Sequence, residues 1–378
     1  MTWYNLSKDG VLTINDGCET IPNGFFRNRE DIKEVIIPNS VRNIRGKAFY
    51  LCSNITKITI PKKGLQFIGE HAFDCCFKLE GFNIPITVIR IGKNAFNACY
   101  SITDIVIPYG ITVLQQKIFM DCSSLVKVRL PPTLNEIHDM AFFGCTKMKS
   151  IKIPNSVFRI GDSAFSCCFN LENIHLSTNL RKMGKSVFIE CSSLLSITVP
   201  KKVIEIRDDF CRGCSNLEHL SISDKVQVIG QNAFDGCKKL RIVRLPNALM
   251  RIMYRAFSNC ESIESIIIPK SVLGIEGKAF CDCSKLKRIV FKNPNTLYDV
   301  SAFTDCVSLV LKKSYKIGKF KNLKKKTNVE VEKCPITCET MTNNSVVVLL
   351  KCGHIFTESA FKEWEKQGNF CPCCRAVF

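Results

Sequence analysis

Four residues near the C-terminus have the types and the spacing of a metal site. Cys352 and His354 are separated by one residue, and Cys371 and Cys374 follow seventeen residues later as a Cys-x-x-Cys pair. Three thiolates and one imidazole complete the tetrahedral ligand set of a structural Zn²⁺ ion. His354 is the only histidine in the last 150 residues, which favours a metal site over a chance cluster. A closed set of four ligands folds a small domain and leaves no coordination position for catalysis, so the function should lie in what this domain presents to partners.

Length and composition set the context for this site. The chain has 378 residues with ordinary hydrophobic content, enough for two or three domains with packed cores. The N-terminal residues lack the pattern of a secretory signal, and the apolar run Val346–Leu350 is too short to span a bilayer. We therefore expect the 23 cysteines to be reduced thiols of an intracellular protein, cytoplasmic or nuclear, rather than the disulfides of an exported one.

Twelve of these cysteines recur at a fixed interval, which is 24 residues at the first step and 23 at every later one. They are Cys52, Cys76, Cys99, Cys122, Cys145, Cys168, Cys191, Cys214, Cys237, Cys260, Cys283 and Cys306. A phenylalanine precedes nearly every one by three positions, and a leucine or a similar residue follows by three. Self-similarity at this period predicts a solenoid whose neighbouring copies bury each other's apolar faces.

Each copy predicts a short strand that ends at a proline, a second apolar pair such as Val157 and Ile160, and a turn or short helix carrying Ala-Phe-x-x-Cys. A small thiol in one inward slot per coil is a core residue, so we expect the cysteines of the ladder to be buried rather than metal-bound or redox-active. Cys211 and Cys214 look like a redox Cys-x-x-Cys pair, but in register Cys211 takes the phenylalanine slot of its coil.

The repeat resembles the BspA-like leucine-rich repeats. Residues 153–165, Ile-Pro-Asn-Ser-Val-Phe-Arg-Ile-Gly-Asp-Ser-Ala-Phe, match that pattern almost letter for letter, and the resemblance extends over about residues 10–311. It implies a leucine-rich repeat solenoid, which we place at residues 1–311. Solenoids of this kind bind proteins on an extended surface.

The middle residue of each predicted strand should point outward. These residues are Thr59, Asn83, Val106, Arg129, Lys152, His175, Thr198, Ser221, Arg244, Ile267 and Val290. The row is not uniform, so it predicts no repeated small ligand. Arg129, Lys152 and His175 are neighbours in it and form a basic patch suited to an acidic partner, although a solvated face without a ligand is an equal alternative.

The formal net charge of +19 is unevenly distributed. Residues 312–333 contain nine lysines and only two glutamates, with few apolar residues, and are interpreted as a lysine-rich linker. Such a run attracts nucleic acid or acidic lipid electrostatically. It has few aromatic residues to stack on bases, so a solvated linker is the favoured interpretation and nucleic acid the less favoured partner.

The last 45 residues, 334–378, begin with Cys334-Pro335-Ile336-Thr337 and resemble the RING and U-box superfamily of ubiquitin ligases, most closely its SP-RING branch. The resemblance implies a small α+β zinc domain. Two positions where a RING carries cysteines hold Thr357 and Ala360, and Cys338 is one place out of register with the opening pair. One structural zinc ion is therefore expected, on Cys352, His354, Cys371 and Cys374, with the second site lost.

By position, the resemblance also implies that Ile336, Trp364 and Pro372 dock a ubiquitin-conjugating enzyme, and that Arg375 steadies the bound modifier. Core packing is an equal alternative for Trp364. No residue of this domain is an expected nucleophile, because the superfamily acts by positioning a charged conjugate. A RING-type ubiquitin-protein ligase with a protein substrate on its solenoid is the favoured function. A SUMO ligase, a scaffold or adhesion protein without enzymatic activity, and a nucleic-acid binder are the alternatives.

Overall fold

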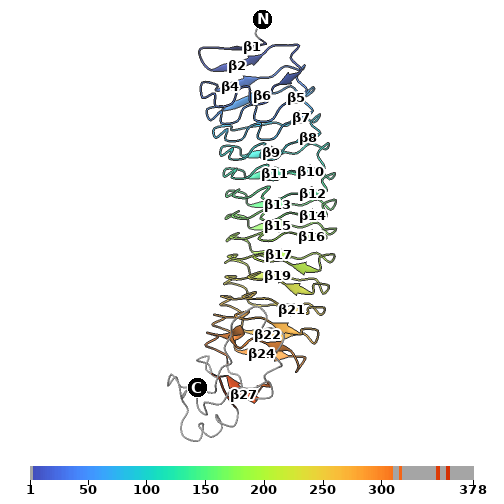
Figure 1. Cartoon of the computed structure of the whole chain (residues 1–378), viewed down its shortest axis with the longest axis vertical. Coiled ribbons are helices and arrows are strands. Elements are labelled where there is room, and N and C mark those ends of the chain that lie inside the picture. Colours follow the sequence, from blue (N-terminus) through green and yellow to red (C-terminus); the bar gives the residue numbers. More distant parts are fainter. Residues whose placement is uncertain (1–2, 310–314, 317–345, 350–354, 358–378) are drawn as a thin grey trace. The chain divides into compact units, whose positions relative to one another are not determined.

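The computed structural model describes residues 3–309, 315–316, 346–349 and 355–357. The chain divides into two compact units, one of residues 1–203 and 209–217 and the other of residues 204–208 and 218–378. Both units are built from the predicted coil, and the fold is a β-solenoid with two short strands in each regular coil (Figure 1). In the described part of the chain, no helix has the length and apolar character needed to cross a membrane.

In the N-terminal unit most coils contribute one strand to each of two rows of parallel strands, the first and the second ladder, and each ladder is divided into several hydrogen-bonded sheets. The first ladder contains β4 (Glu34–Ile36), β6 (Lys57–Thr59), β9 (Asp104–Val106), β11 (Lys127–Arg129), β13 (Ser150–Lys152), β15 (Asn173–His175) and β17 (Ser196–Thr198). The second contains β3 (Thr20–Ile21), β5 (Asn43–Ile44), β7 (Phe67–Ile68), β8 (Arg90–Ile91), β10 (Val113–Leu114), β12 (Glu136–Ile137), β14 (Arg159–Ile160) and β16 (Lys182–Met183). At the N-terminal end, β1 (Tyr4–Leu6) pairs antiparallel with β2 (Val11–Ile14), which pairs with β4.

The C-terminal unit repeats this arrangement. Its first strands are β19 (His219–Ser221), β22 (Ser265–Ile268) and β24 (Arg288–Phe291), and its second strands are β18 (Glu205–Ile206), β20 (Val228–Ile229), β21 (Arg251–Ile252), β23 (Gly274–Ile275) and β25 (Leu297–Tyr298). The 3-10 helix η1 (Val300–Phe303) follows, the one helical turn among the described residues. A separate sheet joins β26 (Tyr315–Lys316), β27 (Val346–Leu349) and β28 (Ile355–Thr357).

The period fixes the strand register, because each residue pairs with the residue one coil further along. Lys152 pairs with His175, 23 residues away, whereas Asn43 pairs with Phe67, 24 residues away. The extra residue of that coil is accommodated near Gly64, which has a φ of 115°. A Cβ there would lie 2.4 Å from the carbonyl oxygen of Asn39, so only glycine fits the tightened turn.

The core of each unit is a stack of phenylalanine rings, one per coil. From Phe26 to Phe188 of the N-terminal unit, successive rings lie 5.4–5.8 Å apart and within 5–15° of parallel. From Phe234 to Phe303 of the C-terminal unit the spacing is 5.2–5.4 Å. At Cys211 the cysteine fills the phenylalanine slot, as predicted, and the ring comes from Phe210, which meets Phe188 edge-on at 85°.

The ladder cysteines confirm their predicted role as core residues. Their side chains are buried, and the described cysteines are all free thiols. In the N-terminal unit, from Cys52 to Cys214, each ladder thiol donates a hydrogen bond of 2.9–3.3 Å to the phenylalanine carbonyl of the coil before. The thiol therefore fills a small slot and also links successive coils.

Two positions in the turn of each coil have a positive φ. Met140 and Glu190 are examples, at 55° and 58°. This backbone region is unfavourable for residues with a Cβ. Each of these residues donates its N–H to the next coil, Met140 to Asp162 at 2.9 Å and Glu190 to Arg212 at 2.7 Å. The strain is thus offset by hydrogen bonds that form only when a neighbouring coil is present.

We expect Phe142→Ala to lower the free energy of unfolding by about 3–5 kcal/mol, because it leaves a cavity between two stacked rings. Phe158→Ala, at a side chain that is 40% exposed, is the matched control and should cost under about 1 kcal/mol. Urea denaturation followed by circular dichroism measures both. Equal losses for the two variants would show that the ring stack is not the core.

The buried thiols should make the fold sensitive to alkali. Burial raises the pKa of Cys52 to about 11, and it raises the pKa of Cys145 well above the ordinary value of 9.0, because a thiolate in the core lacks hydration. The contribution of the buried protonated thiols to the free energy of unfolding is fully present below the pH at which an unfolded thiol ionises. It is lost as the pH rises toward the pKa values of the thiols in the folded protein.

The Tm in reducing buffer should therefore fall steeply from pH 9 upward, as followed by circular dichroism melts. A variant with Cys145→Ala and Cys168→Ala should show a shallower decline. A Tm that falls equally in both proteins, or that does not change with pH, would contradict this account.

Candidate functional site

The described part of the C-terminal domain is a β-hairpin with a third strand. β27 pairs antiparallel with β28 through Val348 and Phe356, and β26 pairs with β27 through Tyr315 and Val347. Tyr315 belongs to the segment interpreted as a linker, so two residues of that segment join the sheet. Cys352 and His354 fall in the five residues between β27 and β28. Only the position of these two residues in the sequence between the strands is thus established.

All the predicted site residues of this domain lie outside the described residues. These are the zinc ligands Cys352, His354, Cys371 and Cys374, the docking residues Ile336, Trp364 and Pro372, and the positioning residue Arg375. The donor chemistry of the set fits zinc, because three thiolates and an imidazole are soft and borderline ligands that suit a structural Zn²⁺. The ligand set and the docking roles stay predictions.

The outward row predicted for the first strands is confirmed, since every residue of it is exposed except half-buried Val290. In the N-terminal unit, Arg129 lies on β11, Lys152 on β13 and His175 on β15. Lys152 and His175 are register partners, and β11 contacts β13. The three side chains therefore form a basic patch on one sheet face, within which the described residues show no ion pair to a carboxylate.

The C-terminal unit has a groove on the equivalent face, with a volume of about 710 Å³. Its lining comes from three successive coils. The residues are Arg241, Ile242, Val243, Arg244, Leu245, Asn247, Ser265, Ile267, Pro269, Lys270, Ser271 and Lys292. Four cations and no carboxylate line this groove, and Ile242 and Ile267, which are 79% and 52% exposed, supply its apolar surface. We call it the basic groove.

Arg244 and Ile267 belong to the predicted outward row, whereas the other residues of the basic groove do not. The outward row contains only the middle residue of each predicted strand, and Arg241 lies before that residue in its coil while Lys270 and Lys292 lie after it in theirs. Comparing the turn positions of successive coils would have shown these cations. It would not have shown the hollow itself, which depends on how adjacent strands pair.

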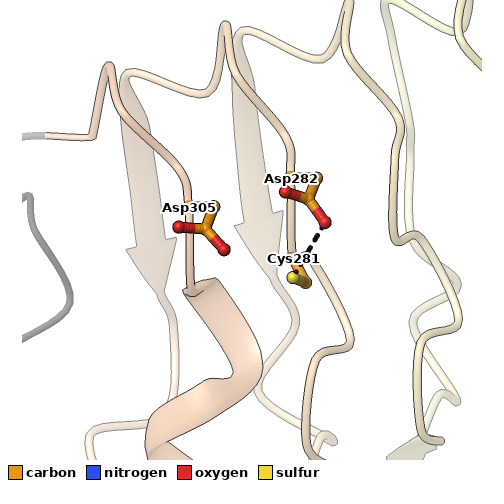
Figure 2. A group of neighbouring side chains, drawn as sticks. All are labelled: Cys281, Asp282 and Asp305. Atoms are coloured by element: carbon orange, nitrogen blue, oxygen red, sulfur yellow. Dashed lines mark hydrogen bonds between the residues drawn. The ribbon is translucent and has the colours of Figure 1, made fainter.

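A cluster of Cys281, Asp282 and Asp305 has potential metal ligands within 4.8 Å of one another (Figure 2). The Cys281 thiol donates to an Asp282 carboxylate oxygen at 3.1 Å. Burial, together with this hydrogen bond and the carboxylate charge, raises the pKa of Cys281 to about 12, so the sulfur keeps its proton. Both aspartates occupy positive-φ turn positions, which aspartate tolerates well. Turn geometry thus accounts for the cluster, and we assign it no ligand.

Comparisons with known proteins agree with this architecture. A model of the BspA type leucine rich repeat region matches residues 3–126, 112–240 and 204–328, and a ring finger domain model matches residues 332–375. No curated protein sequence matches the chain.

Among solved structures, a leucine rich cell surface protein from Faecalibacterium prausnitzii is 29% identical, with a TM-score of 0.52, over 81% of this chain and 91% of that one. A leucine-rich repeat protein from Bacteroides ovatus is 27% identical, with a TM-score of 0.49, over 78% and 97%. The repeat match spans most of the sequence, and the C-terminal match implies zinc binding. The chain belongs to the BspA-type leucine-rich repeat family and carries a RING finger at its C-terminal end.

Proposed function

We propose that this chain is a RING-type ubiquitin-protein ligase whose solenoid binds a protein substrate. The observation that carries the proposal is the union of a long repeat solenoid and a RING finger in one polypeptide. A solenoid offers an extended surface for a protein, and a RING finger is suited to a ubiquitin-conjugating enzyme. Together they bring a substrate lysine and an activated ubiquitin to the same molecule.

The catalytic effect is one of proximity. In our proposal Ile336, Trp364 and Pro372 supply the apolar area that docks the conjugating enzyme, and Arg375 holds the donor ubiquitin by hydrogen bonds. Zinc, when bound by Cys352, His354, Cys371 and Cys374, has a closed coordination sphere and supplies folding free energy to the domain. The nucleophile is the substrate amine, and the enzyme increases its rate of attack by fixing the orientation of the reactants.

A second candidate, a protein-binding scaffold without enzymatic activity, is favoured by one comparison. The similar solved structure from Faecalibacterium prausnitzii is described as a leucine rich cell surface protein. Ligation of SUMO is a third candidate, because the C-terminal resemblance leaves the identity of the modifier open. Assays with charged conjugating enzymes for ubiquitin and for SUMO distinguish the three.

The first test concerns the metal. The full chain should bind one Zn²⁺, measured by atomic absorption after gel filtration. His354→Ala should lose the ion and unfold the RING finger, because metal binding is folding free energy there. The ladder thiols of that variant should stay protected from thiol reagents, which shows that the solenoid remains folded. Two zinc ions per chain would overturn the single-site proposal.

The second test concerns transfer. In single-turnover discharge of ubiquitin from a conjugating enzyme to free lysine, Arg375→Ala should reduce the rate about tenfold, or ~1.4 kcal/mol, with conjugating-enzyme binding retained. Ile336→Ala should lose binding as well as rate, because it removes docking area. Arg129→Ala on the solenoid is the matched control and should leave the discharge unchanged. An intact, zinc-loaded chain that discharges no ubiquitin or SUMO conjugate would exclude both ligase readings and favour the scaffold.

A further inference from the structure

The basic groove of the C-terminal unit lies at one of the breaks in the first ladder. β22 pairs with β24, but residues 242–245 of the preceding coil form no strand, and Ile242 makes only an isolated bridge with His219. β22 therefore has no strand partner on that side in the described chain, although the two coils stay adjacent, since β21 pairs with β23 and Phe257 stacks on Phe280 at 5.3 Å. Ile242 and Ile267 are exposed on the surface of these two coils.

A buried hydroxyl marks the same coil boundary. In the N-terminal unit, Ser156 donates to the Leu134 carbonyl of the preceding coil at 2.5 Å. Ser271 occupies the equivalent position of its coil and lines the groove, but its buried hydroxyl has no hydrogen-bond partner. The side-chain link between coils is thus absent here, and the described chain does not satisfy the Ser271 hydroxyl by itself.

Most of the positive charge of the groove is uncompensated. Among its cations, Arg244 has a distant contact of 4.0 Å with exposed Asp224, and the described residues show no ion pair for Arg241, Lys270 or Lys292. A groove of about 590 Å³ in the N-terminal unit provides the contrast, because its Lys93 pairs with Glu70 at 3.0 Å. Four cations without carboxylates around an apolar floor attract an anionic ligand that also has apolar groups.

Two classes of anionic polymer fit such a charge. Single-stranded nucleic acid is bound by cationic grooves that also carry aromatic platforms for the bases. No aromatic residue lines this groove, and its apolar surface is aliphatic, from Ile242, Leu245 and Ile267. An acidic peptide places carboxylates against the cations and aliphatic side chains against the isoleucines.

We propose that the basic groove binds an extended acidic peptide segment of a partner protein, with aliphatic side chains between its carboxylates. The binding itself is independent of the RING finger. That the partner is a ubiquitination substrate rests on the proposed function.

The test uses the full chain and a phage-displayed library of random nine-residue peptides, followed by fluorescence anisotropy of the selected peptide at 150 mM salt. The selected peptides should be rich in Asp and Glu, with at least one aliphatic residue. Arg244→Glu combined with Lys270→Glu should weaken binding at least tenfold, and Ile242→Ser should weaken it several-fold. Lys182→Glu combined with Lys201→Glu is the matched control, because it reverses the same charge at exposed positions outside both the groove and the basic patch, and it should leave the affinity within twofold.

Three results would overturn the proposal. The first is equal loss of affinity in the groove variant and in the control variant, which means diffuse charge attraction. The second is tighter binding of oligouridylate than of the acidic peptide through the same residues, which assigns the groove to RNA. The third is selection of peptides without acidic enrichment. A chain that discharges no ubiquitin but still binds the acidic peptide would refute the ligase function and leave the peptide-binding proposal intact. The two proposals can therefore fail separately.

Discussion

Each coil of this protein packs between two similar coils, so its two faces must be complementary to each other. The hydrogen bonds of the positive-φ turns, the thiols and the ladders all run from one coil to the next at a separation close to 23 residues. A single coil could neither offset its backbone strain nor bury its phenylalanine. Stability therefore depends on nearest-neighbour contacts, and the inward residues have little freedom to vary.

This constraint leaves the outward positions free to vary in residue type, and the candidate binding residues of the solenoid lie there. Arg129, Lys152 and His175 occupy slots that hold threonine, asparagine or valine in other coils. The basic groove lies at one of the breaks in the first ladder, at residues 242–245. Regular coils thus provide a stiff frame, and the outward side chains that differ between coils provide a candidate site.

Much of this fold could be predicted from the sequence because the repeat encodes it many times over. The strand after most ladder cysteines, the buried thiols and the placement of Cys211 followed from period and residue size, whereas the strands predicted around Asn83 and Arg244 are not formed. The second strand of each coil was read only as an apolar pair, since two-residue strands such as Arg159–Ile160 have no pattern of their own. The positive-φ turns were also missed, because residues such as Met140 and Glu190 carry no signal for that conformation. The basic groove was predicted only in part, since its cations come from different positions of three coils and form no motif.

The central claim is that one chain holds a substrate on its solenoid and transfers ubiquitin through its RING finger. It is tested most directly by fusing the selected acidic peptide to a folded carrier protein and measuring the initial rate of carrier ubiquitination at a subsaturating concentration. Arg244→Glu combined with Lys270→Glu should lower this rate at least tenfold while discharge to free lysine is unchanged. Equal rates of carrier ubiquitination for the intact chain and this variant would contradict the account.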